Sequence, residues 1–215
     1  IMDAPCRAVS SFGSLRHLRA EARPAGAAER CLDCPVEPDC PYSARKIYLG
    51  RVAQGQVGWP VDVLTPDVTA AGVEAALREG PYGRCVYACD NDVLDHQVVT
   101  MQFEGGRTAS FTLAAFTEAG PRRTTLFGTR GELHCDGRTI RVHDFLHDAT
   151  QEIDVARLTA DQPAGHGGGD YGLMDAFVSA VAANDPSLIL SGPRESLESH
   201  LMVFAAERAA WRCSS

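Results

Sequence analysis

Three cysteines within ten residues carry the clearest chemical signal in this 215-residue chain. Cys31, Cys34 and Cys40 form the pattern C-x2-C-x5-C. Two thiolates separated by two residues can bind one metal ion from a single turn, and a third thiolate on the short loop that follows can bind the same ion. A tetrahedral site then needs one more ligand, for which we take Cys85 in preference to Cys89. The imidazole of His17 is a further candidate.

Zinc is the metal that this donor set favours, because a zinc site would hold together the segment 16–66, which has few helix or strand signals of its own. The same thiolates could hold an iron–sulfur cluster. The alternative is a set of reduced thiols beside prolines that bind nothing. Cys6, Cys135 and Cys213 stand alone in strand-like or terminal contexts, and we expect them to be packing residues.

A glycine-rich stretch, AGHGGGDYGLMDAF at 164–177, is the second chemical feature. Gly167, Gly169 and Gly172 spell G-x-G-x-x-G before an expected helix, which is the spacing of a dinucleotide-binding loop. That loop follows directly on a buried parallel strand, whereas the nearest strand expected here, 151–155, ends well before the glycines. Because that strand is missing, we do not expect these glycines to bind a nucleotide.

Two interpretations of this glycine loop stay open. In the first, Asp170 caps the helix that follows and no ligand is needed. In the second, His166 and Asp170 offer an imidazole and a carboxylate to a bound sugar or polyol, which the glycines allow to approach closely.

Composition limits the classes of partner. The chain has 45% hydrophobic and 22% charged residues, typical of a globular protein with a real core. Its net charge of -8 argues against nucleic acid and against anionic membrane surfaces. No apolar run is long enough to cross a bilayer. Eight cysteines are too few for a disulfide scaffold, so we expect a cytoplasmic protein.

The elements that must position these residues follow in an α+β order. We expect a strand at 8–15, a short helix at 42–49 and a helix at 69–79 with Thr69 as its N-cap. Six strands with short turns come next and predict an antiparallel sheet: 96–103, 108–116, 123–127, 131–135, 139–144 and 151–155. Two helices end the chain, at 171–183 and 194–211. Their expected buried faces are Leu173, Phe177, Val178 and Val181, and Leu197, Leu201, Phe204 and Ala205. We expect one domain over 1–215.

Four stretches of the chain resemble the C-terminal domain of the Gfo/Idh/MocA oxidoreductases: GPYGRCVYACDNDVLDHQVVTMQFEGG, FTEAGPRRTTLFGTRGELHCDG, GHGGGDYGLMDAFVSAV and LILSGPRESLESHLMVFAAERA. The most specific parts are G-T-x-G-x-L at 128–133 and the glycine loop at 165–170. The resemblance implies an α+β domain with a large open, mainly antiparallel sheet and helices packed on one face. It also implies oligomers formed through the sheet, and NAD or NADP as cofactor for oxidation of sugars, inositols or related polyols.

This chain departs from the family pattern because it carries neither an N-terminal βαβ region nor the Glu-Lys-Pro motif of the catalytic lysine. We therefore expect Ile1 to continue a helix that begins upstream, and the cofactor-binding domain to lie outside these residues. The chain would then be a substrate-binding and oligomerisation domain, inactive alone and without catalytic residues. The competing hypothesis is a stand-alone binding or assembly module held together by a metal.

The substrate-side residues that this resemblance suggests are His166 and Asp170 on the glycine loop, with Arg122 and Arg123 on a turn between two strands. The alternative interpretation of the two arginines, a solvated turn, is favoured over a substrate role. Asp95 and His96 open a strand and could face either the site or solvent. We expect the remaining histidines of the strand region to be solvated: His134, His143 and His147.

Overall fold

The computed structural model describes residues 2–118, 120–158, 168–189 and 191–212. The chain that we expected to form one domain divides into two compact units. Unit 1 comprises Ile1–Phe116 with Met202–Ser215, and unit 2 comprises Thr117–Leu201. Each unit is described by itself.

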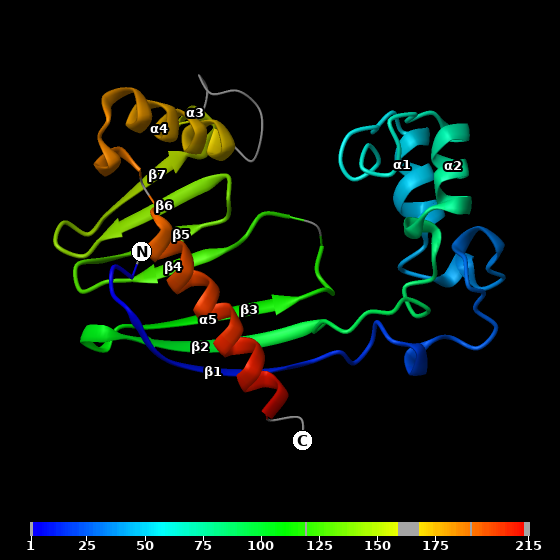
Figure 1. Ribbon diagram of the computed structural model, residues 1–215, viewed down its shortest axis with the longest axis horizontal. Coiled ribbons are helices and arrows are strands. Elements are labelled where there is room, and N and C mark those ends of the chain that lie inside the picture. The colour runs from blue at the N-terminus through cyan, green and yellow to red at the C-terminus, as the bar shows by residue number, and fades with distance from the viewer. Residues whose placement is uncertain (1, 119, 159–167, 190, 213–215) are drawn as a thin grey trace. The chain divides into compact units, whose positions relative to one another are not determined.

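Unit 1 contains a three-stranded antiparallel sheet in the order β1 (Cys6–Ser14), β2 (His96–Phe103) and β3 (Thr108–Ala114) (Figure 1). Alternation along the strands gives the sheet a buried face, on which Ser11 and Val99 lie opposite each other. Ser14 pairs with His96, so the chain leaves the sheet after β1 and returns to the same end of it. The segment 15–95 is therefore one long β1–β2 connection.

The β1–β2 connection has a small core of its own. Its regular helices are α1 (Gly50–Ala53), which continues a π turn at Arg45–Leu49, and α2 (Ala70–Glu79). The hydroxyl of Thr69 accepts a hydrogen bond of 3.1 Å from the N–H of Gly72, which confirms Thr69 as the N-cap of α2. Six buried residues form the core of the connection: Cys31, Leu32, Ala44, Val61, Val73 and Leu77.

Unit 2 contains a four-stranded antiparallel sheet of consecutive strands (Figure 1). They are β4 (Thr124–Phe127), β5 (Gly131–Cys135), β6 (Thr139–Asp144) and β7 (Ala149–Asp154). After them come α3 (Val155–Leu158) and α4 (Gly169–Ala183). The last helix, α5 (Pro193–Arg212), begins in unit 2 and ends in unit 1. The expected strands and both long helices are thus confirmed to within a few residues.

An α+β fold with antiparallel strands is confirmed, but the strands form two sheets where we expected one large sheet. Ala114 ends β3 and Thr124 begins β4, and the stretch between them contains Pro121. Among the described residues β3 pairs with β2 and β4 pairs with β5, and no pairing joins β3 to β4.

The helix faces also differ from the expectation. On α4 the side chains of Leu173, Phe177 and Val181 are exposed, although we expected them in the core. Among the described side chains of α5, Ala206 and Ala210 are buried, while the expected core residues Leu197, Leu201 and Phe204 are exposed. Within the described ranges, no helix is both long enough and apolar enough to span a membrane.

Candidate functional site

Four cysteines expected from the sequence as metal ligands line one small cavity in unit 1. The cavity has a volume of about 20 Å³, and Cys31, Cys34, Cys40 and Cys85 all contribute to its wall. All four are free thiols. The structure therefore brings together thiols from two parts of the chain that are far apart in sequence.

Short backbone turns explain why the first three cysteines converge. Cys34 follows a 3-10 turn at Cys31–Asp33, and its N–H donates to the carbonyl of Cys31 at 3.3 Å. Cys40 follows a second 3-10 turn, Glu37–Asp39, and its N–H donates to the carbonyl of Glu37 at 3.0 Å. Each turn brings its following cysteine back towards the same cavity.

Cys85 reaches the cavity through pairing of extended backbone. Arg30 and Arg84 form an isolated antiparallel bridge, and the N–H of Cys85 donates to the carbonyl of Glu29 at 2.8 Å. Cys89 lines a different hollow, and its thiol donates to the carbonyl of Cys85 at 3.3 Å. The backbone pairing therefore places Cys85, and not Cys89, beside the first cysteines.

The thiol of Cys31 is the most strongly affected by the surroundings of the cavity. Burial raises the pKa of the Cys31 thiol, a backbone hydrogen bond from Ala44 opposes that shift, and charge on the other three thiols adds to it. The N–H of Ala28 donates to the sulfur of Cys34 at 3.4 Å. In the part of the chain that the structure describes, no three His, Cys, Asp or Glu side chains stand in an arrangement that could already hold a metal ion.

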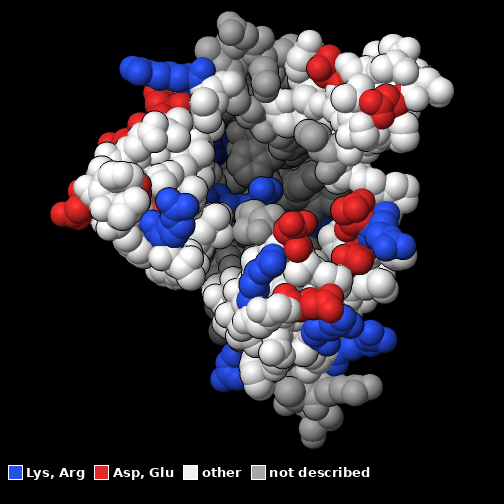
Figure 2. Space-filling view, turned by 90° about the vertical axis from the view of Figure 1, so that its left-hand side faces the viewer, with Lys and Arg blue, Asp and Glu red and all other residues white. Residues whose placement is uncertain are grey.

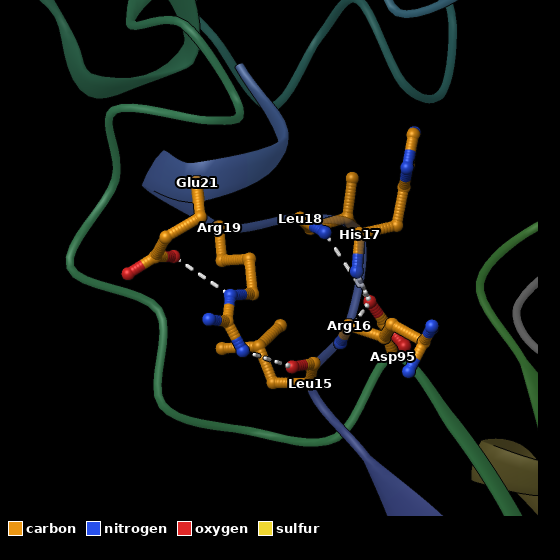
Figure 3. Close-up of polar contacts among 7 residues, drawn as sticks. All are labelled: Leu15, Arg16, His17, Leu18, Arg19, Glu21 and Asp95. Carbon is orange, nitrogen blue, oxygen red and sulfur yellow. Dashed lines mark hydrogen bonds and ion pairs between the residues drawn. The ribbon is translucent and has the colours of Figure 1, made fainter.

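Asp95 proves to be a buried anchor for the β1–β2 connection, facing neither a binding site nor solvent. It is 2% exposed, and Oδ2 accepts hydrogen bonds from the N–H groups of Arg16, His17 and Leu18 at 2.9, 2.6 and 3.2 Å (Figure 3). Oδ1 lies 2.8 Å from Nδ1 of His96. Burial alone would raise the pKa of this carboxyl, but the four polar contacts outweigh it and lower the pKa to about 2.

His17 belongs to an aromatic cluster and does not line the cysteine cavity. Its Nε2 lies 3.0 Å from the hydroxyl of Tyr87. Its ring packs at centroid distances of 5.7 Å from Tyr42, 5.3 Å from Tyr87 and 5.4 Å from Phe116. Because Tyr42 and Tyr87 also line the cavity, His17 supports the wall of the cavity from behind.

The substrate-side candidates are only partly placed. His166 lies outside the described residues. Asp170 is in the first turn of α4, where a carboxylate interacts favourably with the helix dipole. The N-cap position belongs to Gly168, with φ 87°, so Asp170 lies two residues inside the helix and not at the N-cap position itself. Arg122 and Arg123 are exposed in the stretch before β4.

Arg123 does line a second feature, a polar hollow of about 330 Å³ over the sheet of unit 2. Thr125, His134, Arg141 and Glu152 also line it, and they pair in one row across all four strands. Nδ1 of His134 lies 3.3 Å from the Thr125 hydroxyl. We expected His134 to be merely solvated. The register of the strands could have revealed that His134 lies beside Thr125 and Arg141, since directly opposed residues share one face of a sheet.

The polar hollow offers both signs of charge. Two guanidinium groups, from Arg123 and Arg141, line it together with the carboxylate of Glu152. Figure 2 shows acidic and basic side chains lying close to one another among the described residues that face the viewer. This pattern suits a neutral ligand with many hydroxyl groups better than a polyanion.

Comparison with known proteins gives no relative: no family model matches the chain, and no curated protein or solved structure is significantly similar to it.

Proposed function

We propose that this chain is the substrate-binding and oligomerisation domain of an NAD(P)-dependent oxidoreductase that acts on a sugar, an inositol or a related polyol. The observation that carries the proposal is the polar hollow across β4–β7. Guanidinium groups donate, a carboxylate accepts, and a threonine hydroxyl and an imidazole can do either. A polyol needs this mixture, because each of its hydroxyl groups both donates and accepts.

The resemblance to Gfo/Idh/MocA enzymes supplies the reaction type in this proposal. Hydride transfer requires a nicotinamide held against the substrate carbon and a group that takes the proton of the hydroxyl. A cofactor-binding domain outside these residues would supply both. The role of this chain is then to bind and orient the polyol, and we expect no turnover from it alone.

Exposed apolar side chains support a role in assembly. Leu173, Phe177 and Val181 on α4 are between 53% and 65% exposed. On β1 and β2 of unit 1, Phe12 and Val98 are directly paired and both exposed. Within each unit, exposed apolar side chains on one element are the kind of surface that soluble proteins use for contacts with a partner. We propose a homo-oligomer in the cytoplasm, where the seven free cysteines of the described chain would stay reduced.

The proposal is tested with the intact protein encoded by the gene, assayed for NAD- and NADP-linked oxidation of a panel of sugars and inositols. We expect Arg141→Gln to raise KM by about tenfold, the loss of one charged hydrogen bond, with little change in kcat. Arg130→Gln changes an exposed arginine of the neighbouring β4–β5 turn, and it should leave both constants unchanged. Absence of turnover with every substrate, together with no cofactor binding in calorimetry, would overturn the proposal.

A further inference from the structure

We propose that Cys31, Cys34, Cys40 and Cys85 bind one structural zinc ion that holds the β1–β2 connection together. The proposal rests on the cavity in unit 1 and is independent of the polar hollow in unit 2. Four thiols from two distant stretches meet at a single cavity. Four cysteines complete the tetrahedral shell of a structural zinc site, in which no position is left open for catalysis.

Hydrogen bonds already present around the cavity suit thiolate sulfurs. Ala28 donates its N–H to the sulfur of Cys34 at 3.4 Å, and the backbone of Ala44 hydrogen-bonds to Cys31. The guanidinium of Arg23 lies within electrostatic reach of Cys34 and Cys85. Donors to ligand sulfurs and a nearby cation stabilise the negative charge that four thiolates leave on a divalent ion. The protein thus provides the surroundings of the site as well as its ligands.

The ligand set suits a single ion. The cavity is small, with a volume of about 20 Å³, and four cysteine sulfurs complete the shell of one zinc ion at Zn–S distances of about 2.3 Å. An iron–sulfur cluster can use the same four ligands, and the metal measurement below distinguishes the two. Since the sulfurs do not yet stand in a ligand arrangement, binding would turn the thiol side chains towards the centre of the cavity.

The position of the cavity explains what the ion would do. Cys31 is itself part of the small core of the connection and is 8% exposed, beside Leu32 and Ala44. The other ligands lie on 3-10 turns and on the paired stretch around Arg84. Zinc would therefore join the turns, the core and the returning chain at one point, and its binding free energy would become folding free energy.

The first experiment measures metal in the full 215-residue chain, purified with a reductant and without chelator. We expect about one zinc per chain and negligible iron. The thiols are then mapped by alkylation with iodoacetamide, with zinc present and after EDTA. Cys31, Cys34, Cys40 and Cys85 should be protected by zinc and become reactive after EDTA. Cys6 and Cys135 should react equally under both conditions and serve as internal controls.

Variants then assign the ligands. Cys34→Ser and Cys85→Ser should lose the stoichiometric zinc, whereas Cys6→Ser and Cys89→Ser should retain it. Less than stoichiometric zinc after incubation with added zinc, or equal alkylation of all thiols with and without zinc, would overturn the proposal. So would a disulfide among the four, or iron as the bound metal. The alkylation experiment uses the unmodified chain, so a variant that fails to fold does not affect its outcome.

Discussion

Replacing Asp95 with asparagine removes one negative charge and keeps the shape of the side chain. The carboxylate accepts three backbone N–H groups at the start of the β1–β2 connection and contacts His96 at the start of β2. Asparagine can still accept from some of these groups, but it resembles the protonated acid in having no charge. The variant therefore isolates the contribution of ionisation to the free energy of unfolding.

The magnitude follows from the pKa. The ordinary value of 3.8 falls to about 2 in the folded chain, and each pKa unit is worth about 1.4 kcal/mol. Ionised Asp95 thus stabilises the fold by about 2 kcal/mol. Because the folded pKa is the lower one, this stability is fully present above pH 3.8 and is lost as the pH falls towards 2. Asp95→Asn should be about 2 kcal/mol less stable than wild type at pH 7.

Urea unfolding measured between pH 7 and pH 2 tests this expectation. Unfolding is followed by far-UV circular dichroism and by the fluorescence of Trp59, which belongs to unit 1 as Asp95 does. The matched control is Asp67→Asn, because Asp67 accepts hydrogen bonds from Thr69 while remaining exposed. The control should change stability far less. If wild type and Asp95→Asn kept a constant difference from pH 5 to pH 2, the assigned role of the charge would be wrong.

Two further substitutions test the packing around α2 by the same unfolding measurement. A Cβ at Gly83 would lie 1.6 Å from the carbonyl oxygen of Leu77, so Gly83→Ala should cost about 1 to 3 kcal/mol. The control is Gly58→Ala, because a Cβ at Gly58 meets nothing within 4 Å; equal losses of stability in the two alanine variants would contradict this reasoning. Thr69→Ala removes the hydroxyl that accepts from the N–H of Gly72 and should lower the free energy of unfolding by about 1 kcal/mol. Thr69→Ser should restore that stability, and a failure to do so would argue against a capping role.

The elements of this fold were predictable because local signals agree with one another. The strands His96–Phe103, Gly131–Cys135 and Thr139–Asp144 have the bounds that alternation and turn residues predict. Helix α2 ends at Glu79, before Gly80, as the sequence predicts. Division into two sheets was not predictable in the same way, because alternation within strands does not determine which strands pair across a longer connection. An apolar helix face likewise predicts which side of the helix is suited to packing, but it does not predict which element, if any in this chain, covers that side.

The residues of the candidate site were also predictable only where a local signal exists. Spacing was enough to single out Cys31, Cys34 and Cys40, since they lie on successive turns. The choice between Cys85 and Cys89 depends on the Arg30–Arg84 bridge, a long-range pairing without a local signal. Asp95 was harder still, because its partners are backbone N–H groups of a distant turn. Backbone donors occur at nearly every residue, so no residue type identifies them in advance.

Three successive ties along the β1–β2 connection explain how so irregular a segment can fold. The Asp95 carboxylate closes its base. Above the base, Arg30 donates to the carbonyls of Leu77 at 2.7 Å and Gly80 at 2.6 Å, so the stretch before the cysteines is held to the end of α2. The third tie is the proposed zinc site. The entropic cost of closing a loop grows only with the logarithm of its length, so a long connection closed at its base costs little more than a short one. The Asp95 contacts do not involve the cysteine cavity. Loss of zinc should therefore release the turns around the cavity, while the Asp95 contacts and the three-stranded sheet remain.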